Sequence, residues 1–323
     1  MHAHIEPIAP TSIMPEKISL KENIFNYATQ SLGFDDCRFT GPHLSNTLEV
    51  YKRWLKENYH GDMDYLKTHL KFKEDPDLLL TNVKSAIVLI KNYRNTNERR
   101  LKNTLKISRY AVGKDYHTVI REKLARLSDF IKREDAAIEC YCGVDSSPLP
   151  ERSLALKAGI GFLGKNSMVI KPGLGSYFFI GVILTTHDFK SDKPMSWNCG
   201  KCHLCIDACP TRAITDKNTV NATKCISYQT IEQKSPMTKN DIRKAEGWLF
   251  GCDICQEVCP YNHDNTPLTN WTEFLPQAGV GFDFFDKSFD GMISPIPKTT
   301  PLHRSRNRIF PNLQTALNIF KKK

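Results

Sequence analysis

Apolar and polar residues follow two different periods along residues 19–190, and these periods predict helices and strands in succession. Residues 46–58 carry apolar positions at helical spacing, and in residues 117–133 the apolar side chains again fall on one helical face. Three segments rich in β-branched and aromatic residues are typical of strands: 85–93, 137–142 and 176–186. The pattern predicts a mixed helix-and-sheet domain of the α+β or α/β class over residues 19–190.

The pattern changes after residue 190, where cysteine replaces apolar residues as the recurring element. Eight of the eleven cysteines lie between Cys199 and Cys259, so a small domain held together by metal is expected over residues 191–265. The other three, Cys37, Cys140 and Cys142, are expected to be small buried apolar residues. The remaining segments are an N-terminal extension, 1–18, and Pro-rich loops with one short basic helix at 311–320, within residues 266–323.

The composition is that of an ordinary globular chain, with 40% apolar and 25% charged residues. No apolar run approaches the ~18 residues needed to span a membrane, and residues 1–23 carry neither a secretory nor a twin-arginine signal. We therefore expect a cytoplasmic protein without a membrane partner. In that reducing compartment, closely spaced cysteines indicate metal binding rather than disulfides.

The spacing of the cysteines predicts two iron-sulfur clusters. The run "CGKCHLCIDACP" matches the complete pattern C-x2-C-x2-C-x3-C-P, whereas "GCDICQEVCP" has only its last three cysteines. In two-cluster ferredoxins the fourth cysteine of each run binds the other cluster. The predicted ligand sets are Cys199, Cys202, Cys205 and Cys259 for one [4Fe-4S] cluster, and Cys209, Cys252, Cys255 and the displaced Cys225 for the other. A pair of zinc sites is the alternative, because C-x2-C pairs also bind zinc.

The segment "GIGFLGKN", residues 159–166, contains the G-x-G-x-x-G pattern of dinucleotide-binding loops. That fingerprint must follow a strand and open a helix, whereas this segment follows a helical stretch and leads into a strand-like one. We therefore reject a dinucleotide site. The glycines are expected to let backbone approach a flat ligand or a neighbouring strand, or to form a tight turn.

The aspartate of "VDSSPLPERS", Asp145, stands at the end of a predicted strand and before a Pro-rich turn. This is a position at which mixed helix-and-sheet folds present chemical groups, and a carboxyl group there can act as a general acid. The alternative is a structural role in a turn or a helix cap, which is the commoner fate of Asp in such a context.

The formal net charge of +10 indicates an anionic partner or a solvated basic surface. Two clusters bound by eight thiolates lower that charge to roughly +6. Charge alone does not separate these two interpretations.

Taken together, five segments resemble epoxyqueuosine reductase, the cobalamin-dependent enzyme of tRNA wobble-base modification. They are "GKDYHTVIREKL" (113–124), "VDSSPLPERSLALKAGIGFLGKNSMVI" (144–170), "CGKCHLCIDACPTRAI", "KCISYQTIE" and "GCDICQEVCPYN". The resemblance extends from about residue 20 to residue 265, and its segments occur in the order of the family.

The resemblance implies a base-off corrinoid held by the N-terminal domain against a ferredoxin-like domain with two [4Fe-4S] clusters. The implied reaction reduces the epoxide of epoxyqueuosine, in the anticodon loop of a tRNA, to the alkene of queuosine with two electrons and release of water. An external low-potential electron donor supplies the electrons, and a monomer is expected.

The resemblance also implies roles for single residues. Asp145 matches the proton donor, so we expect it to be buried and protonated when it acts. Contacts to the corrinoid are implied for Lys73, Ser108, Arg152, Lys165, Asn166, Val169, Ser227 and Asp253. Lys73 stands where an arginine can occur in the family, and Ser108 where some members have cysteine.

Many family members continue into helical repeats, and this chain stops about 60 residues after its last cysteine. We therefore expect it to be a short form, in which tRNA contacts come from the core and from basic residues near the C-terminus. These are Arg304, Arg306, Arg308 and the run Lys321–Lys323.

Two alternative functions stay open at this point. A reductive dehalogenase combines a corrinoid domain with clusters, but such enzymes usually carry the twin-arginine signal that residues 1–23 lack. A ferredoxin-type electron carrier would need no corrinoid, so absorbance after reconstitution with cobalamin separates it from both corrinoid enzymes.

Overall fold

The computed structural model describes residues 18–44, 46–95, 106–215, 219–263, 265–277 and 298–304, together with residues 309, 312, 315 and 319. Its centre is a four-stranded antiparallel sheet in the order β1-β2-β7-β4. The strands are β1 (Asp36–Thr40), β2 (Ser85–Asn92), β4 (Cys140–Gly143) and β7 (Phe178–Thr185). The mixed fold expected from the sequence is confirmed, and the antiparallel pairing makes it α+β.

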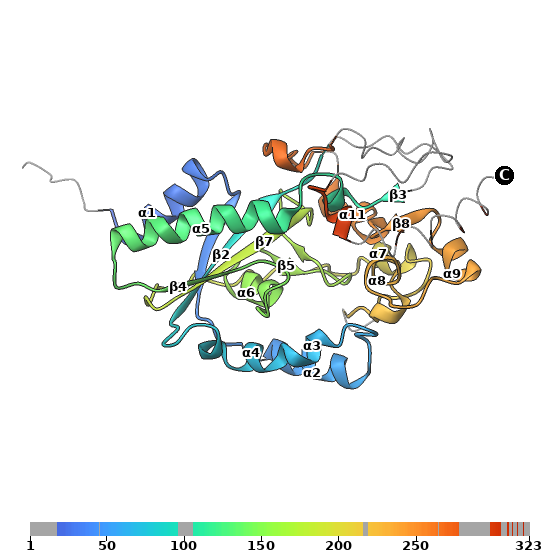
Figure 1. Cartoon of the computed structure of the whole chain (residues 1–323), viewed down its shortest axis with the longest axis horizontal. Helices are drawn as coiled ribbons and strands as arrows, with labels where there is room; N and C mark the ends of the chain where they lie inside the picture. The colour runs from blue at the N-terminus through green and yellow to red at the C-terminus, as the bar shows by residue number, and fades with distance from the viewer. Residues whose placement is uncertain are drawn as a thin grey trace, which may run out of the picture.

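Helices cover both faces of the sheet, as Figure 1 shows. On one face α1 (Leu20–Asn26) and α5 (Tyr116–Glu134) pack against the strands, and on the other lies α6 (Glu151–Lys157). All eight residues of β2 are buried, because alternate side chains enter the two cores. The α2 (Asn46–Lys56), α3 (Tyr65–Thr68) and α4 (Leu70–Glu74) helices lie beyond α6.

A second core lies at one end of the sheet. Its short strands β3 (Lys106–Ile107) and β8 (Trp248–Phe250) pair in parallel, although they are far apart in the sequence. Around them lie α7 (Leu204–Asp207), α8 (Ile226–Ile231), α9 (Lys239–Lys244), α10 (Ile254–Glu257) and α11 (Pro301–Arg304). Ile107, Phe250 and Leu302 are buried together in this core. The segment of β3 therefore packs with the second core, whereas the domain limits drawn from the sequence stay a prediction.

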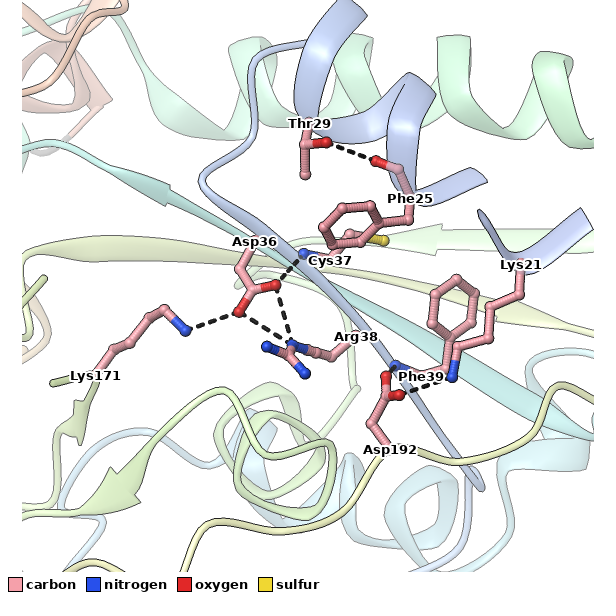
Figure 2. Close-up of polar contacts among 9 residues, drawn as sticks. All are labelled: Lys21, Phe25, Thr29, Asp36, Cys37, Arg38, Phe39, Lys171 and Asp192. Carbon is pink, nitrogen blue, oxygen red and sulfur yellow. Dashed lines mark hydrogen bonds and ion pairs between the residues drawn. The ribbon is translucent and has the colours of Figure 1, made fainter. Parts of the chain in front are cut away.

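The edge strand β1 is held by polar contacts to the segment that leads into the cysteine-rich region (Figure 2). The backbone N–H of Phe39 donates to Asp192 Oδ2, and the backbone N–H of Asp192 donates to the Phe39 carbonyl, both at 2.8 Å. Lys21 pairs with the same aspartate at 2.7 Å. Buried Asp36 accepts from Lys171 at 2.8 Å. The two contacts to Phe39 occupy backbone groups that an open sheet edge would offer to other chains. Together the contacts fix residues 190–193 beside the sheet.

The local elements expected from periodicity are found with small shifts. The helices expected at 46–58 and 117–133 are α2 and α5, and the strands expected at 85–93 and 176–186 are β2 and β7. The strand expected at 137–142 begins three residues later, because the backbone N–H of Ile138 closes a turn on the Asp135 carbonyl. Nearly all of the expected helix 311–320 and residues 1–17 lie outside the described residues. Within the described part of the chain, no helix has the length and apolar character of a membrane span.

Candidate functional site

The glycine-rich segment forms a tight hairpin, not a nucleotide loop. It follows α6, contains β5 (Phe162–Leu163) and leads into β6 (Val169–Ile170), and the two strands pair antiparallel. A Cβ atom at Gly161 would lie 2.2 Å from the Ile170 carbonyl oxygen, so only glycine allows this approach of the two strands. The rejection of a dinucleotide fingerprint is confirmed, as is the close approach to a neighbouring strand.

The tip of the hairpin contacts both parts of the cysteine-rich region. The Lys165 ammonium donates to the carbonyls of Gly200 at 3.0 Å and Cys202 at 2.7 Å. The Asn166 amide donates to the Cys255 carbonyl at 3.3 Å, and this asparagine is buried. Two residues that the resemblance assigned to the corrinoid thus connect the first domain to both cysteine runs.

Four cysteines surround one cavity of about 380 Å³, part of it open to solvent. They are Cys199, Cys202, Cys205 and Cys259, and Lys165, Asn166 and Leu204 also line the cavity. Burial raises the pKa of the Cys205 thiol, and the nearby thiols of Cys199 and Cys259 raise it further. The structure brings together the same four cysteines that the crossing pattern groups.

The other four cysteines gather beside them. Burial raises the pKa of Cys252, and the neighbouring thiols of Cys225 and Cys209 add to that effect. Cys255 is half-buried near Cys252 and Cys225, with Cys205 of the first group also within electrostatic reach. Among the described residues, no three His, Cys, Asp or Glu side chains converge to hold a single metal ion.

The three cysteines outside these groups pack on the first core. Cys37 is 1% exposed in β1, as expected for a small apolar residue. Cys140 and Cys142 are only half-buried, and the Cys142 thiol donates to the Leu124 carbonyl at 3.6 Å. None of the three lies in the cysteine-rich region.

The Asp145 carboxylate lies at the end of β4 in a hydrogen-bonded cluster. Tyr116 Oη donates to its Oδ2 at 2.5 Å, and His117 Nε2 lies 2.9 Å from the same oxygen. The other ring nitrogen, Nδ1, is 2.8 Å from Asp115 Oδ1. The backbone φ of Asp145 is +47°, a left-handed conformation that Asp and Asn tolerate better than most residues. The side chain keeps 60% of its surface exposed, so it can meet a substrate.

The resting structure favours the ionised form of Asp145, and its burial and protonation when it acts stay a prediction. Desolvation by surrounding protein raises its pKa, but hydrogen bonds from His117 and Tyr116 and the charges of His117 and Arg304 outweigh that, so the net pKa is lowered. For His117, burial lowers the pKa, whereas hydrogen bonds to Asp115 and Asp145 raise it more. The two carboxylates therefore favour the protonated form of the imidazole.

A second carboxyl, Glu151, was missed by the sequence reasoning. It begins α6, and within the part of the chain that the structure describes its buried Oε1 atom has no hydrogen-bond partner. Burial, aided by the charge of Asp145, raises its pKa to about 8. Lys73 lies nearby, donating to the carbonyls of Pro148 at 3.3 Å and Leu149 at 3.1 Å, and burial lowers its pKa. The only sequence signal was an acidic residue beside Arg152 in "LPERS".

The remaining residues assigned by resemblance occupy varied environments. Arg152 is exposed and donates to the Ser167 carbonyl at 2.8 Å, and Ser227 is half-buried in α8. The side chain of Val169 packs into the core under the sheet, so only its backbone is available to contact a ligand. Asp253 is buried and its Oδ2 accepts from the Arg109 backbone at 2.8 Å. Ser108 is buried, and its Oγ has no hydrogen-bond partner among the described residues.

Of the C-terminal basic residues, only Arg304 lies within the described part of the chain. Arg304 is described and contacts the Asp145 cluster through His117 and Asp115. Arg306, Arg308 and Lys321–Lys323 lie outside the described residues, so their expected role in tRNA contact stays a prediction.

Two family models match the chain. One, described as a 4Fe-4S double cluster binding domain, matches residues 198–262, and the other, described as epoxyqueuosine reductase QueG, DUF1730, matches residues 73–146. Curated relatives are named epoxyqueuosine reductase. The relative from Cyclobacterium marinum is 37% identical over 288 residues, covering 88% of this chain and 92% of its own length. The relative from Escherichia coli K12 is 37% identical over 253 residues, covering 76% and 66%.

Solved structures agree with these relatives. One is a crystal structure of epoxyqueuosine reductase with an epoxyqueuosine-modified stem loop of tRNA-Tyr, at a TM-score of 0.81 and 30% identity, covering 94% of this chain and 82% of that chain. Another, from Bacillus subtilis, has a TM-score of 0.80 at 30% identity with the same coverage, and is described with its aspartate-bearing catalytic loop swung out of the active site.

Proposed function

Because this chain belongs to the epoxyqueuosine reductase family, we propose that it reduces epoxyqueuosine to queuosine at the wobble position of tRNA. The observation that carries the proposal is the Asp145 cluster, in which a solvent-facing carboxylate is hydrogen-bonded to a histidine that favours its protonated form. Such a pair suits a reaction that must protonate an oxygen at neutral pH. The aspartate-bearing catalytic loop described for the Bacillus subtilis structure supports this assignment.

The two groups of cysteines are proposed to bind two [4Fe-4S] clusters, with Cys199, Cys202, Cys205 and Cys259 holding one and Cys209, Cys225, Cys252 and Cys255 the other. The match to a double-cluster model over residues 198–262 supports this. Clusters of this kind pass one electron at a time. Lys165 and Asn166 hold the hairpin against both cysteine runs through backbone carbonyls. The first group lines an open cavity, so electrons from an external donor are proposed to enter there.

Cobalamin is the proposed second cofactor, and the residues present fit a large polar ligand near the second core. The buried, unpartnered Ser108 Oγ is the observation that tests the fit, because a buried hydroxyl normally has a partner. We propose that the group is held by Lys73, Ser108, Arg152, Lys165, Asn166, the backbone of Val169, Ser227 and Asp253. When bound, cobalamin supplies a low-potential metal centre that delivers electrons to an epoxide carbon.

The chain's own residues are proposed to manage the protons. Reduction of an epoxide to an alkene takes up two electrons and two protons and releases the oxygen as water. As negative charge develops on that oxygen, a proton passes to it from the Asp145 carboxyl, which is replenished from His117 Nε2 at 2.9 Å. Tyr116 keeps the carboxylate oriented through its hydroxyl at 2.5 Å. Asp145 can therefore act as a general acid although it is mostly ionised at rest.

The proposed substrate is an anticodon loop, and the net charge of +10 suits it. Anticodon loops present unstacked bases that enter protein pockets, while lysine and arginine contact phosphates. Action on tRNA places the proposed enzyme in the cytoplasm, and a monomer stays a prediction.

The direct test is mass analysis of anticodon-loop nucleosides after incubation of epoxyqueuosine tRNA with the reconstituted protein and a low-potential reductant. The expected result is conversion to queuosine that requires both iron loading and cobalamin. Conversion without cobalamin, or no conversion by fully loaded protein, contradicts the proposal. A matched tRNA that carries unmodified guanosine at the wobble position should remain unchanged.

A further inference from the structure

The α11 helix brings a cation to the proton-donating cluster from 187 residues away in the sequence. A guanidinium nitrogen of Arg304 lies 2.9 Å from His117 Nδ1, and its Nε lies 3.2 Å from Asp115 Oδ2. The guanidinium thus contacts both groups that sit behind the Asp145 carboxylate. Its side chain is 53% exposed, so the contact is not a consequence of close core packing.

The position of Arg304 is fixed by its helix rather than by its own side chain. Pro301 and Leu302, at the start of α11, are buried, and Leu302 packs in the second core. The segment before the helix is tied to the start of α5, where the Asp115 backbone N–H donates to the Thr299 carbonyl at 2.6 Å. The guanidinium is therefore delivered to His117 by a docked segment.

We propose that Arg304 is a positioning residue for epoxide reduction, holding the His117 ring so that Nε2 faces Asp145 and easing release of its proton. The inference rests on the proposed function, and it adds a residue from outside the two segments that form the cluster, residues 115–117 and Asp145. Arg304 itself does not touch the substrate oxygen. Its effect is transmitted through His117 and Asp115.

The arrangement around the imidazole supports this role. Nδ1 of His117 faces a carboxylate, Asp115, and a guanidinium, Arg304, while Nε2 faces Asp145. The two carboxylates favour the imidazolium, and the guanidinium disfavours it. Among the described residues, the phenols of Tyr110 and Tyr116 also pack here, and burial raises the pKa of both, so they stay neutral. Arg304 thus limits how firmly the ring retains its proton.

The sign of the effect on pH dependence follows from these contacts. Proton donation requires the imidazolium, so turnover falls as pH rises through the His117 pKa. Arg304→Met removes a cation and raises that pKa, which moves the alkaline limb to higher pH. Asp115→Asn removes the acceptor that favours the imidazolium and moves the limb to lower pH. Opposite shifts from two adjacent contacts are not expected of residues with a merely structural role.

The first experiment measures the His117 pKa directly, by NMR titration of imidazole ¹⁵N-labelled protein carrying clusters and cobalamin. The His117→Gln variant assigns the signal. We expect Arg304→Met to raise the pKa by about one unit, Arg304→Lys to leave it within a few tenths, and Arg121→Met to leave it unchanged. Arg121 is the matched control, because its guanidinium contacts Ser146 beside Asp145 but not His117. An unchanged pKa in Arg304→Met overturns the proposal.

The second experiment measures single-turnover rates on epoxyqueuosine tRNA across pH. Arg304→Met is expected to be slowed at least about tenfold at neutral pH, with its alkaline limb shifted upward, and Arg304→Lys to recover part of the rate. A loss of rate without a shifted limb, while tRNA affinity falls, makes Arg304 only a phosphate contact and contradicts the proposal. If the wild-type protein shows no turnover, the proposed function fails, whereas the NMR titration still tests the contact. Should Arg304→Met fold poorly, Arg304→Gln serves both measurements.

Discussion

Replacement of Asp145 by asparagine separates the chemical role of this residue from its structural one. Asparagine is nearly the same size and tolerates the φ of +47°, so the turn after β4 should keep its conformation. The amide oxygen can still accept a hydrogen bond from Tyr116 Oη, which lies 2.5 Å from Oδ2 of the native aspartate. What the variant lacks is a proton to transfer. Alanine is a poorer choice, because it adds strain at positive φ and removes both hydrogen bonds.

The expected loss follows from two effects in the same direction. General acid catalysis is worth about 10²–10⁴ in rate, which corresponds to roughly 2.7–5.4 kcal/mol of activation free energy. In addition, the charge of Asp145 and its hydrogen bond raise the pKa of His117, so the variant also holds less imidazolium at neutral pH. We therefore expect turnover to fall at least about a hundredfold, with iron content, corrinoid absorbance and tRNA affinity unchanged.

The assay is single-turnover conversion of epoxyqueuosine tRNA, read by nucleoside mass analysis. Asp129→Asn is the matched control, because it makes the same chemical change at an exposed position of α5. Turnover of Asp145→Asn within a few-fold of the wild type would refute the assignment, since the proton must then come from water or another side chain. Loss of corrinoid or of folding would instead show that Asp145 is a turn residue.

The remaining predictions concern the clusters and the buried carboxyl. Cys225→Ser and Cys255→Ser should damage the same cluster, which would appear as lower iron and sulfide counts and as the same loss of electron paramagnetic resonance signal. The control Cys37→Ser should keep about eight iron atoms per chain. Full iron loading in Cys225→Ser would contradict the ligand set, unless the serine oxygen substitutes for the thiolate. The unfolding temperature of Glu151→Gln should rise relative to that of the wild type as pH increases from about 5 to 8. The reason is that the Glu151 pKa is raised to about 8 in the folded protein, so the wild type loses at most about 1.4 kcal/mol per pH unit over that window. A constant difference in unfolding temperature across that range would show that the carboxyl titrates normally.

Local features were predictable from the sequence because their causes are local. The helical period over 117–133 specified the buried face of α5, and the apolar run over 85–93 specified a fully buried strand. Cysteine spacing likewise allowed the eight cysteines to be divided into two groups, because a short run cannot enclose one cluster. The rejection of the nucleotide loop depended only on the order of helix and strand, which the α6 helix and the β5–β6 hairpin confirm.

Only the tertiary structure decided how these pieces meet. The segment "KDYH" could be quoted for its resemblance, but nothing in its spacing shows that His117 contacts Asp145, 28 residues later, or Arg304 from a separate helix. The protonation of Asp145 during the reaction stays a prediction, whereas in the resting structure its pKa is lowered, because a pKa depends on charges and hydrogen bonds from residues distant in the sequence. The same holds for Glu151, which looks like an ordinary first-turn acid in the sequence and becomes a buried carboxyl beside Lys73 only when α6 packs under the sheet. Periodicity and spacing thus determine which side chains an element presents, whereas the folded chain decides which charges face one another.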